Sequence, residues 1–127
     1  ISVAMFVGSP VYTVNMMQRE MDTTPYIDNG RTYVPIRALS DGLGALVNYD
    51  DKTQKISIVY GAERVEMTVG SNVVTTTKRG SYHTDVAPVI QDGRTMIPLR
   101  TAAEALGCDV EAVTNQYGST LGAIFSK

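Results

Sequence analysis

The sequence contains two versions of one motif, PYIDNGRTYVPIR at residues 25–37 and PVIQDGRTMIPLR at residues 88–100. Both versions contain Gly-Arg-Thr, two further residues, and then proline, an apolar residue and arginine. The versions are offset by 63 residues. Chance is a poor explanation for this agreement, because a repeat with a fixed offset indicates one structural unit used twice.

The repeat extends beyond the motif in both directions. Downstream, a Leu-Gly pair is followed by a valine at residues 43–47 and at residues 106–110. Upstream, Val-x-Met-x-Val-Gly-Ser occupies residues 3–9 and residues 65–71. A unit this small would be marginal alone, so we expect the two copies to share a sheet or core. The predicted units are residues 1–62 and residues 63–127.

Each unit has the sequence pattern of a small antiparallel sheet. Alternating apolar residues and β-branched runs predict strands, and Asn29-Gly30 and Asp92-Gly93 are dipeptides typical of type I′ hairpin turns. Gly61-Ala62 is expected to join the last strand of the first unit to the first strand of the second. The predicted strands are residues 3–7, 11–14, 25–27, 32–34, 47–49, 55–60, 64–69, 73–76, 88–90, 95–97, 110–113 and 119–125.

A short helix is expected directly after each motif. Pro35 and Pro98 suit the first helical position, where a missing N–H leaves no hydrogen bond unmade. Gly44 and Gly107 lie where a left-handed C-cap belongs. The predicted fold class is therefore α+β, with two tandem units that each pack a small twisted antiparallel β-sheet on one short α-helix. The expected apolar stripes are Ile36, Leu39 and Leu43 in the first copy, and Leu99, Ala102 and Leu106 in the second.

These residues resemble the repeat of the copper amine oxidase N-terminal, or stalk, domain family. The resemblance rests on Gly30–Arg37 and Gly93–Arg100, and on a Val-x-aromatic strand that ends at Tyr49. The second copy departs from the pattern late, with Ala112 in place of the aromatic residue. The resemblance implies two tandem copies, a helix wrapped by a twisted sheet, and a secreted or cell-surface setting, commonly among wall- or S-layer-associated proteins of Gram-positive-type bacteria. The stalk is distant from the catalytic domain of the oxidase, so neither copper nor amine oxidation carries over.

Composition argues against several classes of protein. The 127 residues carry 11 Lys+Arg and 13 Asp+Glu, and this acidic balance argues against nucleic acid as the main partner. No apolar run approaches the ~20 residues that span a bilayer. The single Cys108 excludes an internal disulfide, and the single His83 excludes a metal site built on a histidine pair. We therefore expect no enzyme activity, no cofactor and no metal.

Four other features could carry chemistry, and each has a simpler structural interpretation. Ser81, His83 and Asp85 are the residue types of a catalytic triad, but neighbours on a strand alternate faces, so we interpret His83 as a surface residue. Cys108 is expected to be a small buried residue, with an intermolecular crosslink as the alternative. The third feature is the group Met16, Met17 and Met21, which we interpret as adaptable loop packing rather than a Cu(I) site. The fourth is Asp50-Asp51, which we interpret as a polar hairpin tip rather than calcium ligands.

Arginines of the repeated motif are the best candidates for binding. Their guanidinium groups can clamp carboxylates, phosphates or anionic wall polymers. The alternative is structural: each arginine braces its own unit through turn carbonyls or an acid such as Asp41 or Glu104, and recurrence in both copies favours it. Carbohydrate stacking on the seven tyrosines is also open, although the absence of tryptophan weakens it. The candidate residues are Arg31, Arg37, Arg94 and Arg100.

The first and last predicted strands have no sequence neighbour with which to pair. Both are apolar and lack the charged residues that protect a free edge. They could pair within the chain and close it pseudo-symmetrically. Alternatively, the last strand of one chain pairs with the first strand of the next, which forms rings or open fibres; this is our hypothesis. The edge residues are Val3, Met5, Val7, Leu121, Ala123 and Phe125.

The expected function is that of a non-catalytic extracellular or cell-surface structural module that acts through protein–protein contacts. Its specific form would be self-assembly into a filament or surface layer, with further copies or other surface proteins as partners. The alternative is a module that binds cell-wall polysaccharide or a partner protein through arginine and tyrosine side chains. Because the chain begins with Ile1 rather than methionine, we expect a piece of a longer protein or a mature form without its leader.

Overall fold

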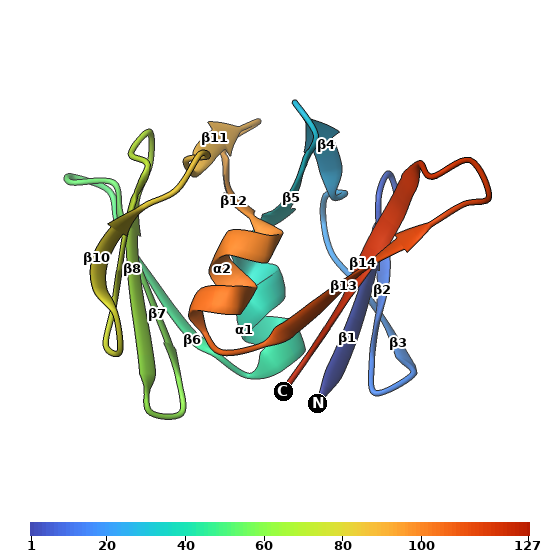
Figure 1. Ribbon diagram of the computed structural model, residues 1–127, viewed down its shortest axis with the longest axis horizontal. Helices are drawn as coiled ribbons and strands as arrows, with labels where there is room; N and C mark the ends of the chain where they lie inside the picture. The colour runs from blue at the N-terminus through green and yellow to red at the C-terminus, as the bar shows by residue number, and fades with distance from the viewer.

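The computed structural model describes residues 1–127 as fourteen strands and two short helices. Strands form 53% of the chain and helices 11%. The strands make three antiparallel sheets, two with five strands and one with four. In Figure 1 a five-stranded sheet lies on either side of the paired helices, and the four-stranded sheet lies above them. Neither helix has the length and apolar content needed to cross a membrane.

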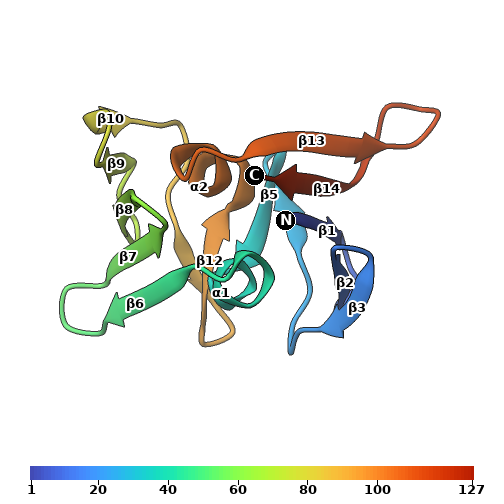
Figure 2. The same ribbon diagram turned by 90° about the horizontal axis from the view of Figure 1, so that it is seen from below.

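The first five-stranded sheet contains both ends of the chain. Its strands are β1 (Ser2–Phe6), β2 (Val11–Val14), β3 (Met17–Glu20), β13 (Asp109–Thr114) and β14 (Thr120–Ser126). They lie in the order β13-β14-β1-β2-β3, with Val3 of β1 opposite Phe125 of β14. The backbone N–H of Lys127 donates to the carbonyl of Ile1 over 3.1 Å, so the two termini lie side by side (Figure 2).

The second five-stranded sheet is formed by one continuous segment. Its strands are β6 (Leu46–Asp50), β7 (Lys55–Tyr60), β8 (Glu63–Thr68), β9 (Val73–Thr76) and β10 (Gly80–His83), in the order β10-β9-β8-β7-β6. The predicted hairpin at Gly61-Ala62 is confirmed, because β7 pairs with β8. This sheet has the strand order of the first when β6 is matched to β13, β7 to β14, and β8, β9 and β10 to β1, β2 and β3.

The four-stranded sheet joins the two copies of the repeated motif. Its strands are β4 (Tyr26–Asp28), β5 (Arg31–Pro35), β11 (Val89–Gln91) and β12 (Arg94–Pro98), in the order β11-β12-β5-β4. At its centre β5 pairs with β12, and Val34 lies opposite Ile97. The predicted type I′ turns are confirmed by positive φ angles at both central residues, 51° and 76° at Asn29-Gly30 and 51° and 74° at Asp92-Gly93.

Helices α1 (Arg37–Leu43) and α2 (Leu99–Ala105) begin at the end of each motif, as predicted. The predicted place of the prolines at the first helical position is wrong, because Pro35 ends β5 and Pro98 is the extended N-cap of α2. Gly44 is a left-handed C-cap with φ 80°, and its N–H donates to the carbonyl of Ser40 over 3.0 Å. Gly107 is also left-handed, with φ 83°, although α2 has Leu106 as its C-cap. Both predicted apolar stripes are buried, which confirms the face that each helix turns to the core.

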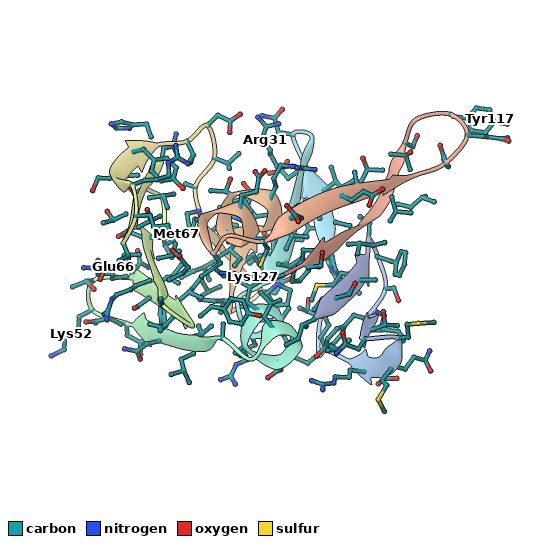
Figure 3. The ribbon with its side chains drawn as sticks, turned by 60° about the horizontal axis from the view of Figure 1, so that its bottom comes forward. Arg31, Lys52, Glu66, Met67, Tyr117 and Lys127 are labelled. Atoms are coloured by element: carbon teal, nitrogen blue, oxygen red, sulfur yellow. The ribbon has the colours of Figure 1, made fainter.

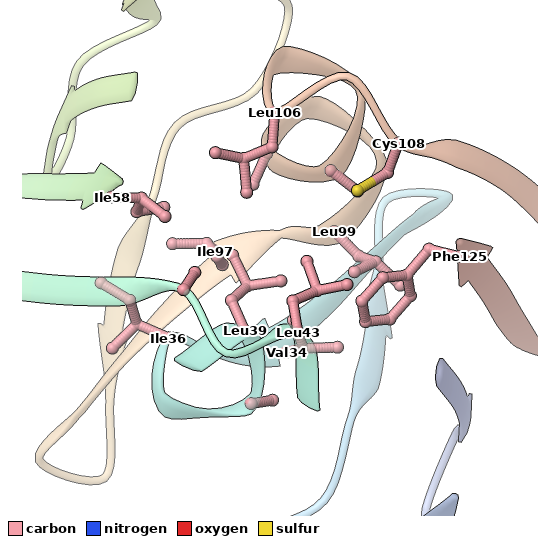
Figure 4. Packing of buried hydrophobic residues seen from close by; sticks show 14 of the residues in the cluster. Val34, Ile36, Leu39, Leu43, Ile58, Ile97, Leu99, Leu106, Cys108 and Phe125 are labelled. Carbon is pink, nitrogen blue, oxygen red and sulfur yellow. The ribbon is translucent and has the colours of Figure 1, made fainter. Parts of the chain in front are cut away.

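One hydrophobic core serves the whole chain. It is a single cluster of 23 buried residues from both halves of the sequence, residues 1–62 and 63–127. Figure 4 shows Leu39 and Leu43 of α1 beside Leu99 of α2, with Ile97 of β12 between the helices and Phe125 of β14 at one side. Each fully buried side chain of this size contributes roughly 1.5–3 kcal/mol through the hydrophobic effect.

The predicted α+β arrangement of two units, each a sheet on one helix, is wrong. The protein is mostly β-structure in three sheets, and every sheet contains strands from both halves. The strand pair after each helix joins the three-stranded meander of the other half, because neither half has enough apolar surface to close a core alone. Strands β3 and β10 were not predicted from the sequence; β3 is exposed at every position and shows no alternation.

The first and last strands pair within the chain, which is the first of the two arrangements considered from the sequence, and not with the strands of a second copy. The two strands pair with each other in the middle of the first sheet, and the N–H of Val7 donates to the carbonyl of Leu121 over 2.9 Å. This pairing buries the apolar side chains without a second copy, whereas the edges of that sheet are β3 and β13. Of the predicted edge residues, the core contains Val3, Met5, Ala123 and Phe125.

Substitution of Gly122 tests the close approach of β1 and β14. A Cβ atom at this position would overlap the carbonyl oxygen of Met5 and lie 2.9 Å from Cδ1 of Phe6. We expect Gly122→Ala to lower the free energy of unfolding by about 1–3 kcal/mol in urea titrations, because backbone atoms must move to admit the methyl group. The control Leu121→Ala, at a position 46% exposed, should change it by about 0.5 kcal/mol or less. Equal effects of the two substitutions would contradict the close approach.

Candidate functional site

One ion pair connects each motif to the opposite half of the chain. Arg31, in the first motif, pairs with Asp85 in the loop between β10 and β11. Arg94, in the second motif, pairs with Asp22 in the loop between β3 and β4, with 3.1 Å between Nη2 and Oδ2. Both pairs therefore lie between residues of different halves, at equivalent places in the fold.

A cleft lies beside each ion pair. The α1 cleft, of about 490 Å³, is lined by the start of α1, by β6, by the loop before β4 and by the turn between β11 and β12. The α2 cleft, of about 460 Å³, is lined by the start of α2, by β13 and β14, by the loop before β11 and by the turn between β4 and β5. Arg31 lies at the upper rim of the molecule in Figure 3. Polar residues dominate both linings.

The two clefts contain the same repeated positions. Asp22, Arg37 and Arg94 line the α1 cleft, and Asp85, Arg100 and Arg31 line the α2 cleft at the corresponding places. Within the sequence, Arg31 lies near Arg37 and Arg94 lies near Arg100, as members of the same motif. The structure instead brings Arg37 to Arg94 and Arg31 to Arg100, because the motifs pair antiparallel across the centre of the four-stranded sheet.

The clefts differ in the pairing of the helix arginine, in one aromatic side chain, and in one acid, since Asp51 lines the α1 cleft whereas the equivalent Thr114 does not line the α2 cleft. In the α2 cleft, Arg100 Nη1 lies 3.7 Å from Oε2 of Glu104, and the same nitrogen donates to the carbonyl of Val110 over 3.5 Å. In the α1 cleft, the exposed guanidinium of Arg37 has neither an ion-pair nor a hydrogen-bond partner. The ring of Tyr49 lines the α1 cleft, where the α2 cleft has only the methyl group of Ala112.

The alternative interpretation of the arginines, that each braces its own unit, fits part of this geometry. Arg94 Nη1 donates to the turn carbonyl of Asp92 over 3.3 Å, and Arg100 pairs with Glu104 within its own helix. The shorter contacts run between halves, to Asp22 and Asp85, and neither acid was predicted from the sequence as a partner of an arginine. Their signal was present, because each aspartate lies three residues before the proline that begins its motif.

The charges of the α1 cleft act on one another. The hydrogen bond from Arg94 lowers the pKa of Asp22, and the charges of Arg94 and Arg37 lower it further. Conversely, the hydrogen bond and charge of Asp22 raise the pKa of Arg94. Asp22 is therefore ionised at neutral pH and paired with Arg94, while Arg37 contributes a positive charge to the cleft without forming an ion pair.

The other sequence candidates form no further site. Ser81 Oγ lies 2.8 Å from the hydroxyl of Thr75, and the partner of Asp85 is Arg31, so His83 is not part of a triad. His83 is exposed at the end of β10, as expected. No group of three histidine, cysteine, aspartate or glutamate side chains is arranged to bind a metal.

The structure also places the single cysteine, three methionines and the Asp50-Asp51 turn. Cys108 is 5% exposed, which confirms the expected buried residue, and its burial raises the pKa of the thiol. Met16 and Met17 are 93% and 73% exposed at the turn between β2 and β3, so the expected loop packing is wrong for them. Met21 does pack against the core. Asp50 Oδ1 accepts the N–H of Lys52 over 2.9 Å, which confirms the hairpin tip.

Sequence comparison places this architecture in a known family. The sequence model described as the copper amine oxidase N-terminal domain matches residues 2–118. The chain belongs to this family. The copper amine oxidase N-terminal domain is a non-catalytic accessory domain of those enzymes, so catalysis is not the established role of the family's domain. Its single match here spans both sequence repeats, and the presence of two tandem copies of the domain stays a prediction. Comparisons with curated proteins and with solved structures give no match.

The Arg94–Asp22 pair leads to a prediction about how the stability of this copper amine oxidase N-terminal domain depends on pH. A lowered carboxyl pKa stabilises the fold at pH values above the unfolded pKa of about 3.9, and this stabilisation is lost as the pH falls through the folded pKa. In an NMR titration of the Asp22 carboxyl, we expect a pKa below the ordinary value, and Arg94→Gln should raise it. Arg100→Gln, in the other cleft, should leave it unchanged. An ordinary pKa in the unsubstituted protein would contradict the pairing.

Proposed function

We propose that this chain is a non-catalytic binding module of an extracellular or cell-surface protein. It recognises acidic groups on a cell-wall polymer or a partner protein through its two clefts. The observation that carries the proposal is the convergence of all four motif arginines on these two clefts, at equivalent positions and partly open to solvent.

The chemistry of the clefts supports binding rather than transformation. Arginine is always charged and presents several N–H donors in one plane, which suits carboxylate and phosphate groups. The net charge of the chain is −2, so long-range attraction does not bring an acidic polymer to it. Recognition therefore depends on local contacts within the clefts, and these give specificity for the arrangement of acidic groups.

An extracellular setting agrees with the family resemblance and with the single buried thiol. Stalk-like repeats resemble segments of secreted, wall-associated proteins, and a domain with one shielded cysteine forms no unwanted crosslinks in an oxidising medium. The natural counterpart would be a polymer of the bacterial wall or a neighbouring surface protein.

Adsorption to purified Gram-positive cell wall tests the proposal. We expect the protein to sediment with the wall, and Arg37→Gln combined with Arg100→Gln to reduce the bound fraction about tenfold, because each substitution removes charge-assisted hydrogen bonds. Neither arginine belongs to the pairs that connect the two halves, so the fold should survive.

The matched control substitutes arginines outside the clefts. Arg64→Gln combined with Arg79→Gln changes the net charge by the same amount and should leave adsorption intact. Failure of the unsubstituted protein to bind would overturn the proposal. Equal losses in the two double variants would also overturn it, since binding would then follow net charge alone.

A second candidate function is self-association, which was the first hypothesis from the sequence. One observation favours it: the β1–β14 contact has no covalent link, yet it matches the place of the β7–β8 hairpin in the other five-stranded sheet. The first half of one chain could therefore close a core with the second half of another, and every strand pair would be kept. Repeated exchange of this kind produces open chains of molecules.

The turn at Gly61-Ala62 is the hinge for this exchange. Gly61 has φ 60°, so the turn depends on a left-handed conformation that a shortened loop could not adopt. We expect deletion of Gly61 and Ala62 to convert monomers into dimers or larger species in size-exclusion chromatography with light scattering, because strained hinges favour exchange. Insertion of Gly-Ser-Gly-Ser at the same turn is the control and should give monomers. A deletion variant that stays monomeric would contradict this candidate.

A further inference from the structure

The α1 cleft combines an unpaired cation with an aromatic wall. Arg37 lies at the first turn of α1, where no carboxylate contacts it, and Tyr49 of β6 lines the same cleft. Tyr49 is half-buried and packs against the hydrophobic core, so the position of its ring is set by that packing. A fixed aromatic surface beside a free guanidinium is the pairing that the α2 cleft lacks.

Two acidic groups also line the α1 cleft. Asp22 is held by Arg94, and Asp51 lies in the cleft at the tip of the β6–β7 hairpin without an ion-pair partner. Each ionised carboxylate has two oxygens that accept several hydrogen bonds, and the cleft also contains the hydroxyl of Ser40. A ligand for this cleft therefore needs one anionic group for Arg37 and several hydroxyl donors for the carboxylates.

We propose that the α1 cleft is the binding site for a sugar that carries a carboxylate, of the uronic acid class. The carboxylate pairs with Arg37, the apolar face of the sugar ring lies on Tyr49, and ring hydroxyls donate to Asp22 and Asp51. This inference rests on the proposed function and deepens it, because it names one cleft and one class of ligand.

Recognition of the sugar is divided between these groups. Arg37 selects for the charge, since a guanidinium and a carboxylate form parallel N–H···O bonds of fixed geometry. Tyr49 supplies contact area at a small cost in side-chain entropy, because the core already restrains its ring. Arg94 positions Asp22 through their ion pair and so fixes where a hydroxyl group is accepted.

The α2 cleft provides an internal comparison. Glu104 already pairs with Arg100, so a ligand carboxylate would meet a compensated cation there. Ala112 offers no ring on which a sugar could stack. The α2 cleft is therefore expected to bind the same ligand much more weakly, although it has the equivalent ion pair between halves.

A galacturonate trisaccharide and its fully methyl-esterified form test the proposal. The ester keeps the sugar and removes its charge. In NMR titrations of the full chain, we expect the acid to bind with one-to-one stoichiometry and to shift amide signals of α1 and β6. The ester should bind at least tenfold more weakly, because the charge-assisted hydrogen bonds to Arg37 are lost.

Matched substitutions locate the site. Arg37→Gln and Tyr49→Ala should each weaken binding of the acid tenfold or more, whereas Arg100→Gln should change it less than twofold. Tyr49→Ala copies the alanine that the α2 cleft already contains, and thermal unfolding of each variant verifies the fold. Equal affinity for acid and ester, no binding of the acid at 10 mM, or equal effects of Arg37→Gln and Arg100→Gln would overturn the proposal.

A gain of function gives an independent measurement. Ala112→Tyr combined with Glu104→Gln and Thr114→Asp adds the missing ring, frees Arg100 and supplies a carboxylate at the position equivalent to Asp51; all three positions are exposed to solvent. We expect this variant to bind two trisaccharides per chain, with the second site on α2 and β13. A stoichiometry that stays at one would overturn the assignment of selectivity to these three differences.

The outcomes separate this inference from the proposed function. Adsorption to cell wall without uronate binding overturns the sugar assignment and leaves the binding module intact. Uronate binding without adsorption to wall overturns the wall as target and supports the cleft. Displacement of the acid by equimolar inorganic phosphate would show a general anion site and would overturn the inference.

Discussion

The pairing of β5 with β12 is the contact on which the rest of the structure depends. Val34 lies opposite Ile97, and these residues are equivalent in the two motifs and fully buried. The motifs therefore meet head to head across an approximate two-fold axis. Because each motif leads into a helix, the pairing brings α1 and α2 together beneath the four-stranded sheet (Figure 1), where one core forms between the two five-stranded sheets.

The same constraint explains why both clefts belong to the two halves together. Antiparallel pairing of the motifs carries the turn of one half over the helix start of the other, so Arg94 reaches Asp22 and Arg31 reaches Asp85. These ion pairs occur at the equivalent place in both copies and connect the two halves. The positions that do not connect the halves are free to differ, and the chemistry of the clefts diverges there, at Tyr49 and Ala112 and in the pairing of Arg100.

The two ends of the chain meet between β1 and β14, at the place where the equivalent strands β7 and β8 are joined by a hairpin. In one five-stranded sheet the central strands are joined by Gly61-Ala62, whereas in the other the corresponding strands contain the two termini. Burial of Val3, Met5 and Phe125 closes this seam without a covalent connection. An apolar pattern that suggests an exposed edge in the sequence is thus explained by a partner strand that lies at the opposite end of the same chain.

Local features followed from the sequence alone: the repeat and its offset, the type I′ turns at Asn29-Gly30 and Asp92-Gly93, the two short helices and their buried stripes. These depend on backbone preferences and on periodicity over a few residues, which short segments carry in full. Tertiary structure alone decided that β14 pairs with β1, that each sheet mixes both halves, and that Arg37 faces Arg94 rather than Arg31. Such choices depend on which long-range pairing buries the most apolar surface, because strand patterns of this kind are compatible with several partners.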